Sequence, residues 1–416
     1  MTKRILCLLL AAVLLLGLCA CGGQGGKTGT SDEEILAARR DKVVAQMQKT
    51  ATFLWRAQED ITYSIRYDDM LIDEALKVDP KKTVSIKAGQ VYQGLPYSHA
   101  AGNLTTFQAF AGEPDEKGVS TVSGLTWEYL NGTSAYMSRI STDCSGAVYM
   151  ALSTVAATPE MVGTQHMTEG HGYLKVGEYE TADPDENIDT NKDCEDNGAR
   201  VMLDAYAQLQ KADAIVRRRN GVGHVMLITS VNVVLTEEGK VSGRDSTVTV
   251  THQTNGKLQD NAYYYNEELG ENVYYCFGVD DEYTFAELYA DGYLPITCKE
   301  LIDASAPEVD TTVIDSETEF TKDTICKGTL TSQLLITAVN VTITDANGAV
   351  VQEATCFARR GERLVFKLER IATDMPEIMI GKIDPDALAA GNYHCTMTCV
   401  QANDTVTTVR DFDFTV

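Results

Sequence analysis

The spacing of hydrophobic and polar residues changes along the chain and divides it into regions. Near the N-terminus, Lys3 and Arg4 precede an apolar run over 5–18. This run is too short for a membrane-spanning helix, but it has the length of a signal-peptide core. We therefore predict that residues 1–20 are an export signal and that the glycine-rich stretch 21–30 is a flexible tether.

A capping motif opens the next segment. In Ser31-Asp32-Glu33-Glu34 the serine hydroxyl and the Glu34 carboxylate can each accept a hydrogen bond from the other residue's backbone N–H. The apolar positions that follow keep helical spacing only in part. We predict a helix to about Ile61, within an N-terminal helical segment over 31–80 that packs on the main domain.

The region over 81–305 mixes helical and extended patterns. An apolar stretch rich in small residues, Cys144–Ala156, predicts a buried helix, and Ala199–Gln210 predicts another. Runs rich in β-branched residues follow, separated by turn signals, at 214–217, 224–235 and 247–252. We expect an α+β domain in which a helix precedes an antiparallel meander.

The last part of the chain has strand patterns only. Ala304–Asp310 is typical of a linker, and 309–416 has the size of one all-β, immunoglobulin-like sandwich. Asn347-Gly348 lies between two apolar runs and predicts a hairpin. The expected strands cover 334–344, 349–357, 363–368, 392–400 and 405–416.

Composition and charge narrow the class of protein. The chain has 416 residues, of which 44% are hydrophobic and 23% charged, as in globular proteins of two or three domains of about 150 residues each. Asp and Glu number 60 against 35 Lys and Arg, for a formal net charge of -25. Such an excess of carboxylates repels phosphate backbones and anionic lipid surfaces, so we expect no nucleic-acid partner.

The end of the export signal suggests how the chain is held. Leu18-Cys19-Ala20-Cys21 resembles the bacterial lipobox, in which the cysteine after a small residue is acylated once the signal is cleaved. The resemblance implies that Cys21 carries lipid and anchors the protein to the extracytoplasmic face of the cell membrane. The alternative is a plain secretory signal with chance cysteines. In that compartment the remaining cysteines are allowed, but not required, to form disulfides.

Asp143-Cys144 marks the boundary between a polar loop and the predicted buried helix. A thiol at a helix N-terminus meets the positive end of the helix dipole, which favours the nucleophilic thiolate. The alternative is a small buried residue. His224 begins a predicted strand after Gly221-Val222-Gly223, where an imidazole can face a helix start and act as general base.

These segments occur in an order that resembles the NlpC-type cell-wall cysteine peptidases, a circularly permuted branch of the papain-like superfamily. The matching pieces are Gly94-Leu95-Pro96-Tyr97, Asp143-Cys144-Ser145-Gly146, Ala212-Asp213-Ala214-Ile215-Val216 and Gly223-His224-Val225. The resemblance implies a papain-like helix and antiparallel sheet, with Cys144 as nucleophile and His224 as base. It also implies that Tyr97, Asp143 and Ser145 shape the substrate and oxyanion region.

The family takes a third polar residue, which orients the imidazole, from the next strand. Here that strand ends in His252-Gln253, and His252 shares its face with Val248 and Val250. We favour His252 over Gln253. The separation from His224 is longer than usual in the family, and an inserted hairpin through 237–246 would account for it.

The segment after Tyr97 also departs from the family. Ser98-His99 replaces the aromatic-glycine pair typical of this position, which favours a different substrate cleft. His99, His166 and His171 have no compact metal-ligand spacing, so we expect no metal or other cofactor.

An acidic stretch has the alternating carboxylates and amides of a calcium loop. Its members are Asp185, Asn187, Asp189, Asn191, Asp193 and Asp196. Thr190 stands where such a loop needs glycine, so we interpret the stretch as a solvated acidic loop.

The sequence leaves more than one function open. The first hypothesis is a lipid-anchored thiol hydrolase that cleaves an amide bond in peptidoglycan stem peptides, as an endopeptidase or as an amidase. The second is a non-catalytic surface lipoprotein whose C-terminal domain binds a wall polymer or a protein partner. A transglutaminase-like Cys-His-Asp enzyme is a third hypothesis, opposed by the Gly-His-Val context.

Overall fold

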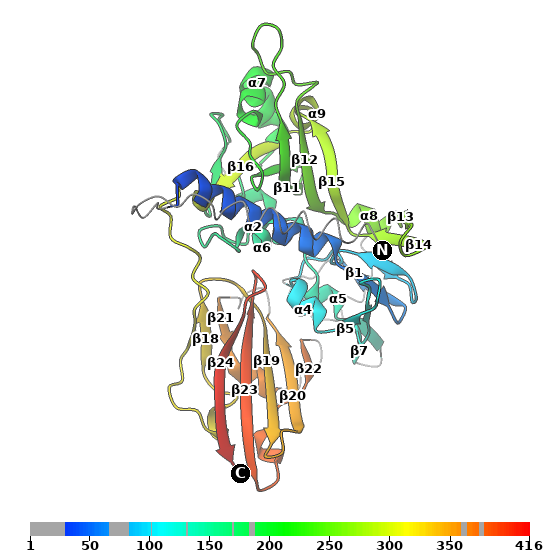
Figure 1. Ribbon diagram of the computed structural model, residues 1–416, viewed down its shortest axis with the longest axis vertical. Helices are drawn as coiled ribbons and strands as arrows, with labels where there is room; N and C mark the ends of the chain where they lie inside the picture. The colour runs from blue at the N-terminus through cyan, green and yellow to red at the C-terminus, as the bar shows by residue number, and fades with distance from the viewer. Residues whose placement is uncertain are drawn as a thin grey trace, which may run out of the picture.

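The computed structural model describes residues 30–65, 83–100, 102–129, 132–168, 170–182, 188–358, 364–373 and 378–416. Within these ranges the chain mixes α and β structure, mostly sheets with few helices (Figure 1). This agrees with the mixed class expected from the sequence. The predicted signal peptide and Cys21 lie outside the described residues.

The first helix, α2, covers Asp32–Thr52. The predicted capping box is present, since the Glu34 carboxylate accepts a hydrogen bond of 2.9 Å from the backbone N–H of Ser31. Three acidic residues in the first turn add to the stability of this end through the helix dipole.

The helix predicted to about Ile61 ends earlier, at Thr52, and residues 53–65 of the predicted helical segment are not helical. Phe53 ends the helix in an extended conformation, and the chain continues into strand β1, Leu54–Ala57, and strand β2, Ile61–Ser64. Side chains in β1 and β2 are buried at every second position, as in a strand with one face on the core. Residues 66–82 of the segment lie outside the described part of the chain.

One antiparallel sheet of six strands has the order β15-β12-β11-β10-β16-β9. Its strands are β9 (Tyr173–Lys175), β10 (Ala214–Arg219), β11 (Val222–Asn232), β12 (Thr247–Gln253), β15 (Phe277–Thr284) and β16 (Leu294–Cys298). The predicted meander is confirmed, because β10, β11 and β12 are neighbours in this order. The predicted insertion between β11 and β12 contains a short antiparallel bridge between Leu235 and Val241.

Helices flank this sheet. They are α6 (Cys144–Leu152), α7 (Thr190–Tyr206) and α9 (Phe285–Ala290). Helix α6 packs on β11 and β12, and α7 packs on β10 and β16. The helix predicted over 199–210 is α7, which begins earlier, at Thr190, and ends at Tyr206. It contains a kink at Gly198, where φ is 79°.

A second, mixed sheet has the order β13-β14-β4-β1-β6-β5. Its remaining strands are β4 (Val91–Gln93), β5 (Ala111–Pro114), β6 (Ser120–Val122), β13 (Tyr263–Asn266) and β14 (Glu271–Tyr275). Short hairpins and helices surround it: β3 (Thr83–Ile86), β7 (Thr126–Tyr129), β8 (Gly132–Ala135), α4 (Leu104–Gln108), α5 (Met137–Ile140) and α8 (Asn255–Gln259).

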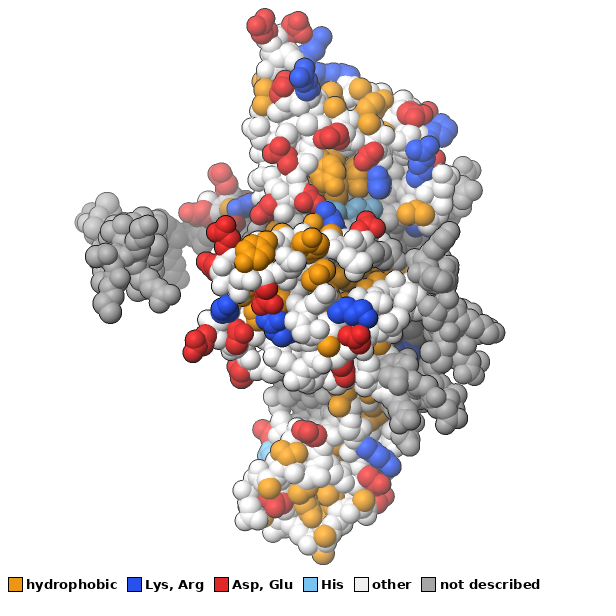
Figure 2. All heavy atoms as spheres, turned by 90° about the vertical axis from the view of Figure 1, so that its right-hand side faces the viewer, with side chains coloured by type: hydrophobic (Ala, Val, Ile, Leu, Met, Phe, Trp, Pro, Cys, Tyr) orange, Lys and Arg blue, Asp and Glu red, His pale blue; other side chains and the backbone are white. Residues whose placement is uncertain are grey.

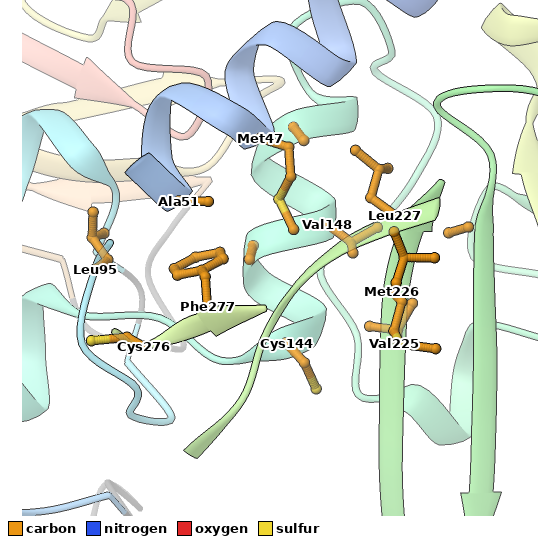
Figure 3. Close-up of a cluster of buried hydrophobic side chains, with 14 of the residues drawn as sticks. Met47, Ala51, Leu95, Cys144, Val148, Val225, Met226, Leu227, Cys276 and Phe277 are labelled. Carbon is orange, nitrogen blue, oxygen red and sulfur yellow. The ribbon is translucent and has the colours of Figure 1, made fainter. Parts of the chain in front are cut away.

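Both sheets and helix α2 share one hydrophobic core. In Figure 3, Met47 and Ala51 of α2 lie beside Val148 of α6, Leu227 of β11 and Phe277 of β15. All five side chains are almost fully buried. Helix α2 is thus part of the same packed unit as the sheet that carries His224.

The C-terminal part is a sandwich of two antiparallel sheets, with orders β17-β18-β21 and β22-β20-β19-β23-β24. The strands are β17 (Val313–Asp315), β18 (Thr329–Ser332), β19 (Ile336–Asp345), β20 (Val350–Phe357), β21 (Val365–Lys367), β22 (Met379–Gly381), β23 (Asn392–Gln401) and β24 (Val406–Thr415). The predicted hairpin at Asn347-Gly348 is confirmed between β19 and β20, with Gly348 at φ 81°. The predicted linker at 304–310 contains no helix or strand.

The sandwich is docked on the rest of the chain by buried contacts. Phe357 and Val400 of the sandwich belong to the core that contains α2 and α6. The Tyr136 hydroxyl donates a hydrogen bond of 2.8 Å to the carbonyl of Met379. The side-chain amide of Asn103 donates one of 2.7 Å to the carbonyl of Gln401.

Three further features of the described part of the chain are its surface charge, its cysteines and the length of its helices. On the face shown in Figure 2, basic side chains lie among acidic ones and do not merge into a continuous basic surface. Each cysteine in the described part of the chain is a free thiol. No helix formed by the described residues is long and apolar enough to cross a membrane.

Candidate functional site

A pocket of about 440 Å³ lies between the start of α6 and the β10–β11 hairpin. Five residues singled out from the sequence line it, namely Tyr97, Asp143, Cys144, Ser145 and His224. His252 lies behind His224 and does not line the pocket itself. The structure therefore brings the predicted nucleophile and base to one solvent-open cavity from separate elements.

The loop before α6 is shaped by its own side chains. Asp143 caps the helix: its carboxylate accepts hydrogen bonds from the backbone N–H of Gly146 at 2.7 Å and from the Ser145 hydroxyl at 2.8 Å. A Cβ on Gly146 would lie 2.2 Å from the Thr142 hydroxyl oxygen, so only glycine fits there. These contacts fix Cys144 as the first residue of α6, as Figure 3 shows.

The thiol of Cys144 does not have the environment expected from its position. Only 6% of the residue is exposed, and burial raises the pKa of the thiol to about 12, with the Asp143 carboxylate acting in the same direction. Backbone N–H groups of Val225, Ser145 and Cys144 itself lower this pKa, but less strongly. Burial therefore outweighs the effect of the helix N-terminus that favours the thiolate.

His224 lies in β11, directly opposite Arg217 of β10. Burial, followed by the nearby His252 and Arg217, lowers the pKa of His224 to about 3. The imidazole is thus uncharged at neutral pH and can accept a proton. Gly223 allows the 3-10 turn at Thr164–His166 to approach, since a Cβ there would lie 1.7 Å from the Thr164 hydroxyl oxygen.

The two candidates for the third residue have different neighbours. His252 Nδ1 lies 2.7 Å from His224 Nε2, with the rings 4.8 Å apart and nearly perpendicular. The Gln253 amide instead donates hydrogen bonds to the carbonyls of Leu95 and Pro96, at 2.8 and 2.9 Å. The structure therefore places His252 against His224, while Gln253 holds the loop that leads to Tyr97.

Asp281 extends this chain of side chains, and it was not found from the sequence. Its Oδ2 lies 3.1 Å from His252 Nε2 and 3.8 Å from the Lys257 ammonium. The hydrogen bond from His252 lowers the pKa of Asp281, and Lys257 acts in the same direction. The contact between His252 and Asp281 depends on an irregularity in the β12–β15 register between Val250 and His252. No sequence motif predicts this irregularity.

Other pocket residues supply polarity. Tyr97 forms a parallel bridge with Thr142, and burial, followed by Cys144 and Asp143, raises the pKa of its hydroxyl well above the usual value. The tyrosine is therefore a neutral hydrogen-bonding group. Arg218 also lines the pocket, and its guanidinium donates a hydrogen bond of 3.3 Å to the Thr164 hydroxyl.

The structure places the remaining histidines and the described part of the acidic stretch at separate positions. His99 lines the pocket, whereas His171 Nδ1 lies 2.9 Å from a Glu160 carboxylate oxygen. Asp189 is the N-cap of α7, so the described half of the acidic stretch begins a helix and is not the loop that we expected; Asp185 and Asn187 lie outside the described residues. No group of three or more His, Cys, Asp or Glu side chains able to hold a metal ion occurs in the described ranges.

Comparisons with known proteins give little further information. No family model and no curated protein matches the chain. A similarity to the crystal structure of CopC from Methylosinus trichosporium OB3b covers 21% of this chain and 72% of that one, with 14% identity and a TM-score of 0.15. A similarity at this level carries no conclusion about function.

Proposed function

We propose that this protein is a lipid-anchored, extracytoplasmic cysteine hydrolase that cleaves an amide bond in peptidoglycan stem peptides. The observation that carries the proposal is the presence of Cys144 and His224 in one solvent-open pocket, with His252 behind the imidazole. The peptide substrate comes from the NlpC-type resemblance. A papain-like core for α6 and its sheet, and an immunoglobulin-like topology for the sandwich, belong to the same proposal.

In this reaction, the proton of the Cys144 thiol passes to His224 as the sulfur attacks the amide carbonyl. The S–C bond forms, and the π electrons of the carbonyl move onto oxygen, where backbone N–H groups at the start of α6 stabilise the charge. Collapse expels the amine, which takes the proton from His224, and water then hydrolyses the thioester. Both groups are neutral before attack, so the thiol proton has to pass to His224 as the S–C bond forms.

The proposed setting follows from the N-terminal sequence. Acylation of Cys21 holds the protein on the outer face of the cell membrane, and this anchor is its only membrane contact. The sandwich is then free to bind a wall polymer or a protein partner. Replacing Cys21 with serine should move the protein from the membrane fraction to the soluble fraction, and unchanged membrane association would exclude the anchor.

The decisive experiment is digestion of defined muropeptides with product identification by mass. Cys144→Ala should lower kcat/KM by on the order of 10⁴-fold or more, since it removes the nucleophile. Cys326→Ala is the matched control, because Cys326 lies in the sandwich and outside the pocket. Full activity in Cys144→Ala would refute the assignment, and the product masses distinguish an endopeptidase from an amidase.

A non-catalytic binding protein is the second candidate, and the raised pKa of the Cys144 thiol favours it. Binding and digestion of the same muropeptides separate the two candidates. A hydrolase should release products that Cys144→Ala does not release, whereas a binding protein should retain the intact muropeptide in both proteins. Muropeptide that is bound but not cleaved by the wild type would favour binding without turnover.

A further inference from the structure

We infer that Asp281 is a positioning residue whose carboxylate sets the tautomers of His252 and His224, so that the proton-accepting nitrogen of His224 is the one left free for the thiol. The inference rests on the proposed function. It assigns a role to a residue that contacts neither the substrate nor the Cys144 sulfur. Asp281 acts through the imidazole rings of His252 and His224.

The hydrogen-bond chain has a fixed direction. An ionised carboxylate only accepts, so across the 3.1 Å contact with Asp281 the proton must be on His252 Nε2. A neutral imidazole carries one N–H, which leaves His252 Nδ1 as an acceptor. Across the 2.7 Å contact the proton must then be on His224 Nε2. His224 Nδ1 is consequently unprotonated, as a general base requires.

Charged groups around the chain hold this arrangement. Lys257, from α8, lies 3.8 Å from the Asp281 carboxylate and favours its ionised form. At the other end, burial and Arg217 disfavour a proton on His224 before attack. Tyr283, from the same strand as Asp281, has its pKa raised by burial and by that carboxylate, so it stays neutral. In the hydrogen-bonded series from His224 to Asp281, the negative charge is therefore confined to the Asp281 carboxylate.

The backbone leaves room for the carboxylate to approach the ring. Gly278 of β15 lies opposite His252 of β12. A Cβ at this position would lie 2.4 Å from His252 Nε2 and 2.3 Å from Asp281 Oδ2, so any side chain would displace one of the two groups. The absence of a side chain at position 278 is thus a condition for the His252–Asp281 contact.

Asp281→Asn tests the direction of the chain. Asparagine can present either its amide nitrogen or its amide oxygen to His252 Nε2, so the proton is no longer held on Nε2 by a group that only accepts. Tautomers with the proton on His252 Nδ1 and, through the second contact, on His224 Nδ1 then become populated. We expect kcat/KM on muropeptides to fall by on the order of 100-fold, as for residues that orient a functional group from behind. Asp280→Asn is the matched control. It removes the neighbouring carboxylate, which accepts a hydrogen bond of 3.3 Å from the Thr229 hydroxyl, and it should keep wild-type activity.

A spectroscopic measurement separates positioning from loss of structure. Side-chain ¹⁵N NMR of the wild-type protein should show both His224 and His252 protonated at Nε2 only, and Asp281→Asn should add the Nδ1 tautomers of both rings. A wild-type His252 that carries a proton on Nδ1 would overturn the inference, and so would unchanged tautomers in a folded Asp281→Ala, in which position 281 offers no acceptor. The wild-type spectrum is decisive even if the variant does not fold.

The two proposals fail in different ways. If the wild-type protein hydrolyses no muropeptide, the proposed function is wrong, whatever the tautomers are. If the wild type is active and Asp281→Ala keeps both its activity and its tautomers, only the role of Asp281 is wrong.

Discussion

Replacing Gly278 with alanine adds a single methyl group at the most crowded point behind the site. The new carbon would lie 2.4 Å from His252 Nε2 and 2.3 Å from Asp281 Oδ2, whereas ordinary contacts begin at 3.4 Å. Both groups, or the backbone at position 278, must therefore move by about 1 Å. Because the hydrogen bond between them is already 3.1 Å long, such a shift takes it beyond bonding distance.

The expected loss is on the order of 100-fold in kcat/KM, which is typical of a misplacement of about 1 Å in a catalytic group. The assay is muropeptide digestion under conditions that give kcat and KM separately, with urea unfolding measured alongside. We expect the loss mainly in kcat, because Gly278 does not line the pocket.

Gly256→Ala is the matched control for this variant. It makes the same substitution in α8, where the nearest atom to the added Cβ is the Thr254 hydroxyl oxygen at an ordinary 3.7 Å. It should retain wild-type kcat and KM. If Gly278→Ala were as active as Gly256→Ala, the His252–Asp281 contact would not matter for the reaction, and the reasoning from distance would be refuted.

Two further predictions concern stability. The pKa of His224 is about 6.5 in the unfolded chain, whereas burial lowers it to about 3 in the folded protein, so acidification favours unfolding. Between pH 6 and pH 4, the free energy of unfolding of the wild type should fall by about 2 kcal/mol more than that of His224→Asn, as measured by urea titration. Arg410→Met leaves Asp315 buried without its ion-pair partner and should lower the free energy of unfolding by about 3–5 kcal/mol, while Lys322→Met, at the exposed pair with Asp386, should change it little. Equal urea midpoints for the last two variants would contradict the second prediction.

Local patterns were sufficient for much of the fold. The capping box at Ser31, the hairpin at Asn347-Gly348 and the meander that carries His224 each depend on residues close together in sequence. The same holds for the start of α6, where Asp143 caps the helix that begins with Cys144. These features are set by turn chemistry and hydrophobic period, which the sequence displays directly.

Features that depend on distant pairing could not be predicted. Strand β1 is held by β4 and by β6, and its own four residues are too few to indicate a strand. Asp281 meets His252 only through a shifted strand register. The raised pKa of Cys144 depends on how completely other segments cover the thiol, which spacing along the chain does not reveal.

The docking of the sandwich sets a limit on how the protein can be divided. Phe357 and Val400 fill space in the N-terminal core, and Asp404 accepts a hydrogen bond of 2.9 Å from the backbone of Thr105. Truncation at the 304–310 linker would expose apolar surface and remove the hydrogen bond between Asp404 and α4. An expression fragment that stops there should therefore aggregate, and the sandwich keeps a constant distance from the pocket in the intact protein.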